Sequence, residues 1–196
     1  MGYSNRFEEA LVYAHRLHHR QVRRGSRTPY INHLLSVAAL VGEHGGSEDQ
    51  VIAALLHDAI EDQGGPAIAA EIRHRFGEAV AELVEACSDT DEDPKPPWRP
   101  RKEAYLQHLR STPPEVLLIT AADKLHNVRS MIIDLRSAGD ALWGRFSGGR
   151  EGTLWYYRSV LTVLEEIWQH PLLEELAYRV NELERMTASP PTSTGT

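Results

Sequence analysis

Four side chains able to bind a metal ion or move a proton interrupt an otherwise apolar helical segment. They are His57, Asp58, Glu61 and Asp62, within Leu-Leu-His-Asp-Ala-Ile-Glu-Asp. On one helix, His57 and Glu61 are four residues apart, as are Asp58 and Asp62, so both pairs would project from neighbouring faces. Unpaired charge beside a core face is costly, and a divalent cation would compensate it. Imidazole and carboxylate ligands that leave positions open suit manganese, iron or zinc.

A His-Asp pair on one helix is weak evidence by itself, because an exposed polar face explains most such pairs. Two further segments strengthen the interpretation as a metal site. His33 follows Thr-Pro-Tyr-Ile-Asn, is expected to begin a helix, and lies 24 residues before His57. Asp123 follows the apolar stretch 116–122, where a buried carboxylate needs a partner.

The elements that must position these residues are expected to be helical throughout. Apolar residues recur every three or four positions, which predicts an all-α bundle of about ten helices. Asn5 is a candidate cap for the first helix, and the Ser47–Gln50 capping box opens a helix expected to run to residue 63. The proline-rich segment 89–100 and the glycine-rich segment 146–152 are expected to be loops. We expect one domain over 1–186 and a disordered tail over 187–196.

The composition narrows the class of protein. The chain has 196 residues and a formal net charge of −7, which argues against a general nucleic-acid or membrane-surface binder. The single cysteine, Cys87, can form no internal disulfide, which fits a reducing cytoplasm. No signal peptide and no membrane-spanning apolar run is recognisable. We therefore expect a cytoplasmic protein that has neither nucleic acid nor membrane as a partner.

Three motifs together resemble the HD-domain phosphohydrolase superfamily. They are Pro-Tyr-Ile-Asn-His at 29–33, Leu-Leu-His-Asp-Ala-Ile-Glu-Asp at 55–62 and Ala-Asp-Lys-Leu-His-Asn-Val-Arg-Ser at 122–130. Their spacing is similar to that of the RelA/SpoT-type alarmone hydrolases in their small single-domain form, over roughly residues 7–167. The resemblance implies an HD-domain helical bundle that hydrolyses the 3′-pyrophosphate of ppGpp or pppGpp, giving GDP or GTP and pyrophosphate. The segment that synthesises these nucleotides in the large relatives is not expected.

The resemblance also implies a role for individual residues. One divalent ion, usually manganese in this family, would be held by His33, His57, Asp58 and Asp123. Glu61 and Asp62 match the acidic pair that orients and activates the attacking water. The candidate substrate contacts are Arg23 against the purine, Asn127 beside the metal aspartate, and Lys95, Lys124 and Arg158 as cations for phosphate.

Several points stay open at this level. The substrate could instead be another nucleotide, such as ppApp or a deoxynucleotide, and a non-catalytic nucleotide sensor is disfavoured because all six metal and acidic positions are present. The segments 23–29, 94–99 and 145–152 depart from the familiar loops of the large relatives, and the last two could border the pocket. The simplest interpretation of His15, His18 and His19 is an exposed helix face, whereas His126 is undecided. The aromatic side chains of residues 155–157 are expected to lie in the core rather than to stack on a nucleotide base. Two interpretations are equally favoured for the basic cluster, a solvated charge run and phosphate contact; the cluster comprises Lys95, Arg99, Arg101 and Lys102. Metal identity and oligomeric state are not predicted.

Overall fold

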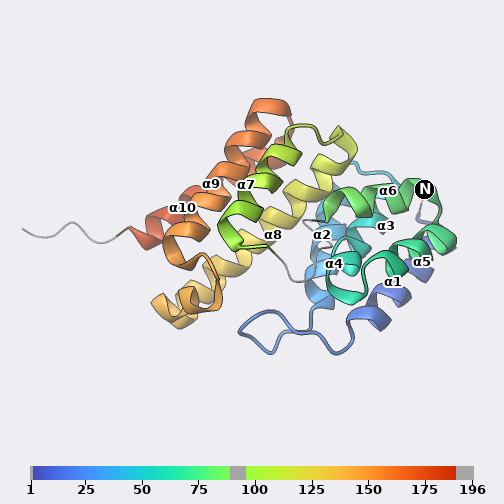
Figure 1. Cartoon of the computed structure of the whole chain (residues 1–196), viewed down its shortest axis with the longest axis horizontal. Helices are drawn as coiled ribbons and strands as arrows, with labels where there is room; N and C mark the ends of the chain where they lie inside the picture. Colours follow the sequence, from blue (N-terminus) through green and yellow to red (C-terminus); the bar gives the residue numbers. More distant parts are fainter. Residues whose placement is uncertain (1, 89–95, 189–196) are drawn as a thin grey trace, which may run out of the picture.

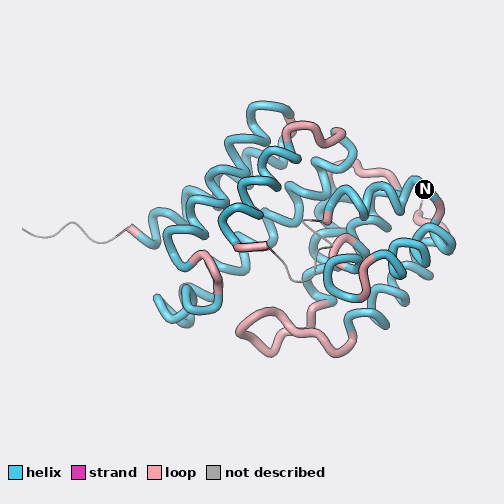
Figure 2. The backbone as a smooth tube through the Cα atoms, in the orientation of Figure 1, coloured by secondary structure: helices cyan, strands magenta, loops and turns pink. Residues whose placement is uncertain are grey.

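The computed structural model describes residues 2–88 and 96–188, and this part of the chain is built from helices (Figures 1 and 2). The N-terminal group comprises α1 (Asn5–His18), α2 (Ile31–Glu43), α3 (Glu48–Leu56), α4 (Ala59–Gln63), α5 (Pro66–Phe76) and α6 (Glu78–Cys87). The rest comprises α7 (Trp98–Leu109), α8 (Pro114–Ala138), the 3-10 helix η1 (Gly139–Arg145), α9 (Gly149–Ile167) and α10 (Pro171–Thr187). The expected all-α fold of about ten helices is confirmed for the described residues.

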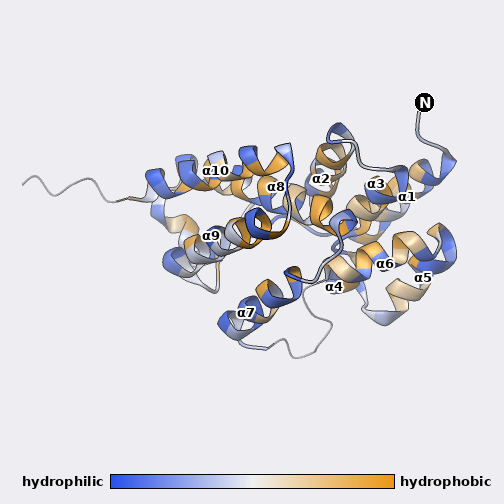
Figure 3. Cartoon of the chain, turned by 90° about the horizontal axis from the view of Figure 1, so that it is seen from above, coloured by the Kyte–Doolittle hydropathy of each residue, from blue (hydrophilic) through white to orange (hydrophobic). Residues whose placement is uncertain are grey.

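Two helices form the centre of the bundle. Helix α3 is buried on all sides from Val51 to Leu56, as expected for a helix that is apolar around its whole circumference. Helix α8 packs against α2, α3 and α6 along one part and against α9, α10 and η1 along another. Figure 3 shows the hydrophilic faces of α9 and α10 turned outward and the hydrophobic residues of α2 and α3 turned inward. The bundle therefore brings His57 and Asp58, which lie between α3 and α4, next to the middle of α8.

The helix ends follow local signals, with some changes from the expected positions. Ser4, rather than Asn5, caps α1 by accepting a hydrogen bond from the Arg6 backbone N–H at 3.2 Å. The Ser47 capping box is present as expected. Helix α7 begins three residues before the expected Arg101, because a proline is tolerated in the first turn of a helix. Helix α10 extends to Thr187, while residues 189–196 of the expected tail lie outside the described residues.

Two expectations about helix continuity were wrong. The helix expected over 47–63 is interrupted by a turn at His57 and Asp58, where the backbone of Asp58 has φ −97° and ψ −1°. The expected glycine-rich loop over 146–152 is half helical, because α9 begins at Gly149. Glycine is required there because the Trp98 indole packs against the backbone. A Cβ atom would lie 2.6 Å from that indole at Gly148 and 3.1 Å from it at Gly152. Among the described helices, none is both long and apolar enough to cross a membrane.

Candidate metal centre and active site

Two buried imidazoles form the floor of the candidate site. His33 lies in the first turn of α2 and His57 at the turn after α3, and they are 1% and 5% exposed. The Nδ1 atom of His57 donates to the Ala54 carbonyl oxygen at 2.8 Å, so Nε2 carries the lone pair whenever the ring is neutral. The Nδ1 atom of His33 lies 2.7 Å from Nδ1 of His126. Both Nε2 atoms are buried and have no hydrogen-bond partner.

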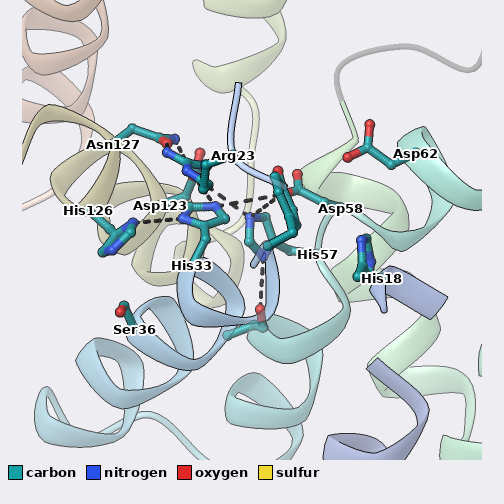
Figure 4. Close-up of polar contacts among 12 residues, drawn as sticks. His18, Arg23, His33, Ser36, His57, Asp58, Asp62, Asp123, His126 and Asn127 are labelled. Atoms are coloured by element: carbon teal, nitrogen blue, oxygen red, sulfur yellow. Dashed lines mark hydrogen bonds and ion pairs between the residues drawn. The ribbon is translucent and has the colours of Figure 1, made fainter. Parts of the chain in front are cut away.

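Two carboxylates face these imidazoles (Figure 4). Asp58 Oδ2 lies 3.1 Å from His57 Nε2 and 3.6 Å from His33 Nε2. Asp123 Oδ1, from α8, lies 3.2 Å from His33 Nε2 and 3.7 Å from His57 Nε2. The ligand atoms of His33, His57 and Asp58 all lie within 4.8 Å of one another. Buried imidazole nitrogens that meet carboxylate oxygens without a hydrogen bond fit a divalent cation, because a cation placed among them attracts all of these atoms.

The electrostatics of His57 and Asp58 lead to the same conclusion. Burial would lower the pKa of His57, but the charges of Asp58 and Asp123 outweigh it and hold that pKa well above its usual value. Burial would raise the pKa of Asp58, but His57 and His33 hold it well below its usual range. These shifts mean that the two carboxylates stabilise positive charge between the imidazoles. A bound divalent ion would supply that charge in place of protons.

Neighbouring side chains hold the two carboxylates in place. The hydroxyl of Tyr30 donates to Asp58 Oδ2 at 2.7 Å. Asn127 Nδ2 donates to Asp123 Oδ1 at 2.5 Å, and Lys124 Nζ donates to Asp123 Oδ2 at 2.6 Å. Partners of this kind orient metal ligands and adjust their basicity.

His126, which the sequence left undecided, belongs to this supporting set. Burial and the neighbouring His33 and Arg23 lower the pKa of His126 to about 4, so its ring is neutral. A neutral His126 can accept a hydrogen bond from Nδ1–H of His33. That arrangement leaves the Nε2 lone pair of His33 directed at the carboxylates.

A cleft opens beside these residues. It has a volume of about 770 Å³ and is lined by the segment before α2, by α2 itself and by the second half of α8. An adjoining cavity of about 380 Å³ shares residues with it and reaches Asp58, Glu61 and Asp123. Five cations line this cavity: Arg23, Arg24, Arg101, Lys102 and Lys124. Cations and carboxylates so placed suit a polyanion whose reacting group lies at the metal ligands.

The acidic pair lies at the edge of this cavity. Glu61 lines it together with Asp58 and Lys124. Asp62 Oδ2 accepts a hydrogen bond from Gln21 Nε2 at 2.8 Å. Burial raises the pKa of Asp62 and outweighs the opposing effect of the Gln21 hydrogen bond. A carboxylate with a raised pKa is a suitable group for proton transfer near neutral pH.

The structure brings most of the predicted substrate contacts together, but not all of them. Arg23, Asn127 and Lys124 line the cavity, and Arg23 Nη2 donates to Asn127 Oδ1 at 2.6 Å. Arg158 does not line it: the guanidinium bonds Asn181 at 2.8 Å and forms an ion pair with Glu184 where α9 packs on α10. Its charge is neutralised there by a carboxylate that the local sequence did not reveal. Lys95 lies outside the described residues.

Two residues of the site were missed by the sequence patterns. His18, expected on an exposed helix face, is 1% exposed. A signal was present, because Ala10, Ala14 and His18 follow one another at intervals of four on the buried face of α1. Gln21, just beyond α1, bonds both His18 and Asp62. No local pattern marks a glutamine in a loop as a partner for a distant carboxylate.

Comparison with known proteins places the chain among relatives of similar sequence. A family model described as HD domain matches residues 10–154. The bifunctional (p)ppGpp synthase/hydrolase SpoT of Escherichia coli K12 is 37% identical over 132 residues, which are 64% of this chain and 18% of SpoT. MESH1 of Xenopus tropicalis, a guanosine-3′,5′-bis(diphosphate) 3′-pyrophosphohydrolase, is 36% identical over 126 residues, 63% of this chain and 68% of MESH1.

Solved structures show the same fold over most of the chain. A metazoan ortholog of SpoT, described as hydrolysing ppGpp, superposes with a TM-score of 0.74 and 26% identity, covering 96% of this chain and 98% of that one. A protein from Listeria monocytogenes EGD-e superposes with a TM-score of 0.69 and 31% identity, covering 78% and 99%. The resemblance to RelA/SpoT-type hydrolases is thus confirmed, and the chain belongs to the HD domain family.

Proposed function

We propose that this protein hydrolyses the 3′-pyrophosphate of ppGpp or pppGpp, giving GDP or GTP and pyrophosphate. The observation that carries the proposal is the convergence of two imidazole lone pairs and two carboxylates beside a cavity lined by five cations. The reaction named for MESH1 supports the choice of substrate.

The proposed cofactor is one divalent ion, with manganese as the first choice. His33, His57, Asp58 and Asp123 would hold it, because their Nε2 and carboxylate oxygen atoms face one another. When bound, such an ion supplies Lewis acidity toward a phosphoryl oxygen and lowers the pKa of water. The ligands come from α2, from the turn before α4 and from α8, so correct packing of all three is needed to form the site.

The remaining chemistry falls to the side chains that line the cavity. Glu61 and Asp62 orient the attacking water and accept its proton. Lys124, which stays charged because Asp123 outweighs the effect of burial on its pKa, stabilises negative charge that develops on phosphate. Arg23 lies with its guanidinium 5.6 Å from the centre of the Tyr30 ring, where it can also stack on a purine.

The proposed partner is a small nucleotide, and the proposed location is the cytoplasm. A formal net charge of −7 disfavours a general nucleic-acid binder, while the cations gathered at the cavity suit a compact polyphosphate. Cys87 is a free thiol, as expected in a reducing compartment.

A panel of substrates tests the reaction. Manganese-loaded protein is incubated with ppGpp, ppApp, deoxynucleoside triphosphates and a generic phosphodiester, and products are identified by chromatography. We expect rapid release of pyrophosphate from ppGpp and little reaction with the others. A clear preference for ppApp would retain the mechanism and overturn the base assignment. Absence of pyrophosphate from both alarmones would overturn the proposed function.

A further inference from the structure

His18 is a buried imidazole that is not one of the proposed metal ligands. Figure 4 shows it on the same side of the site as Asp62, away from His33. Its ring stacks on Tyr30, with centroids 5.3 Å apart and an interplanar angle of 18°. Its Nδ1 atom lies 2.6 Å from Gln21 Oε1. Because an amide oxygen only accepts, Nδ1 of His18 carries the proton and donates.

The contacts of Gln21 define the orientation of its amide. Its oxygen accepts from His18 and also from Gln63 Nε2 at 2.7 Å. Its nitrogen therefore faces the other way, and donates to Asp62 Oδ2 at 2.8 Å. The reversed amide would place two oxygens against each other at Asp62 and lose the hydrogen bond from His18. His18 and Gln63 thus determine which atom Gln21 presents to Asp62.

The same imidazole also supports a second carboxylate. Tyr30, on which His18 stacks, donates its hydroxyl hydrogen to Asp58 Oδ2 at 2.7 Å. The His18 ring therefore contacts one member of each of two hydrogen-bonded pairs, Tyr30–Asp58 and Gln21–Asp62. The two branches can be separated experimentally, because a phenylalanine at position 18 keeps the stacked ring and removes only the polar contacts of Nδ1, with Gln21 at 2.6 Å and with Gln63 Nε2 at 3.3 Å.

From these contacts we propose that Gln21 is a positioning residue for Asp62, and that His18 orients Gln21. The pair holds the Asp62 carboxylate in the one orientation that proton transfer requires. This inference rests on the proposed function, in which Asp62 handles the proton of the attacking water. It assigns no substrate contact to His18 or Gln21, and along this branch both act through Asp62.

The main test removes the hydrogen bonds of Gln21 and His18 while keeping side chains of similar shape. Gln21→Met is expected to lower kcat about 10-fold or more, the loss typical for a hydrogen bond to a charged group, with KM and manganese content unchanged. His18→Phe, which removes a hydrogen bond to the neutral Gln21 amide, is expected to lower kcat about 2- to 10-fold, also with KM and manganese content unchanged. The matched control is His19→Phe, the same substitution at the next position, where the side chain is exposed and bonds only the Arg16 carbonyl oxygen of its own helix. The control is expected to keep wild-type kcat.

Double variants separate positioning from a general structural role. Because His18 acts through Gln21, the variant with both substitutions should lose no more than Gln21→Met alone. In an Asp62→Asn background, Gln21→Met should cause no further loss. Multiplicative losses in either combination would overturn the proposal.

The pH profile provides another readout. The Gln21 hydrogen bond lowers the pKa of Asp62, while burial and the charges of Asp58 and Glu61 raise it and His18 lowers it. Gln21→Met should therefore shift the acidic limb of kcat to higher pH. An unshifted limb would contradict the inference.

A crystal structure gives a readout independent of activity. The Asp62 carboxylate should adopt one orientation in the wild-type protein and more than one in Gln21→Met. The same single orientation in both would overturn the inference. Inactive wild-type protein would instead defeat the proposed function, and the crystallographic comparison would still decide whether Gln21 positions Asp62.

Discussion

The backbone of Gly25 lies directly against the side chain of Arg145. A Cβ atom at position 25 would lie 2.2 Å from Arg145 Cδ, and the backbone there has φ +73°. Arg145 is held by an ion pair with Asp134 at 3.1 Å, and its carbonyl oxygen accepts from Arg24 at 3.2 Å. The segments 23–29 and 145–152 thus contact each other beside the cavity. We infer that this contact places Arg23 and Arg24 over the substrate.

Gly25→Ala tests that contact. A non-glycine residue in the left-handed region costs about 1–2 kcal/mol, and the added methyl group would displace Arg145. We expect a severalfold higher KM for ppGpp with little change in kcat. The matched control is Gly45→Ala, which has φ +80° but no atom within 4 Å of an added Cβ. Both variants should lose stability in denaturant titrations, and an equal KM change in both would contradict the inference.

The metal centre makes a second prediction. Protein purified without a tag should contain about one equivalent of divalent metal by elemental analysis, because one set of four ligands fits one ion. His57→Ala should abolish binding, since it removes a buried donor atom. His15→Ala, on the exposed face of α1, should bind normally. Full metal retention in His57→Ala would show that the ligand assignment is wrong.

Stability should also depend on the ion. A ligand at 100 times its dissociation constant stabilises the folded state by about 2.7 kcal/mol, provided that it does not bind the unfolded chain. Chelation should therefore lower the melting temperature of the wild-type protein and leave that of His57→Ala unchanged.

Glu61→Gln separates metal binding from chemistry. Glu61 lines the cavity beside Asp58, yet the ligand atoms that converge belong to other residues. General acid–base help is worth about 10²–10⁴-fold in rate, so we expect a loss of that size in kcat with metal content unchanged. Near-normal turnover would show that Glu61 does not handle the proton.

Lys102 and Arg158 should behave differently. Lys102 lines the cavity, whereas Arg158 pairs with Glu184 between α9 and α10. Lys102→Ala should raise KM and weaken the salt dependence of substrate binding, because a cation near phosphate is lost. Arg158→Ala should leave KM unchanged and cost about 0–1 kcal/mol of stability, as for other exposed ion pairs. Equal KM changes would restore Arg158 as a substrate contact.

The sequence by itself determined the local features of this protein. Helical periodicity and the Ser47 capping box depend on interactions within one or two turns, so they can be read from neighbouring residues. The motifs around His33, His57 and Asp123 likewise indicated a shared metal site, because imidazole and carboxylate groups in apolar helices require compensation.

Tertiary structure decided which distant groups meet. The Arg158 guanidinium is neutralised by Glu184 of another helix, and nothing within a turn of Arg158 specifies that partner. His18 is buried because Tyr30, Gln21 and Gln63 surround it, although its neighbour His19 is exposed. Whether a polar side chain is solvated, structural or part of the site depends on which long-range partner satisfies its charge or hydrogen bonds, and only the packing of the helices provides that partner.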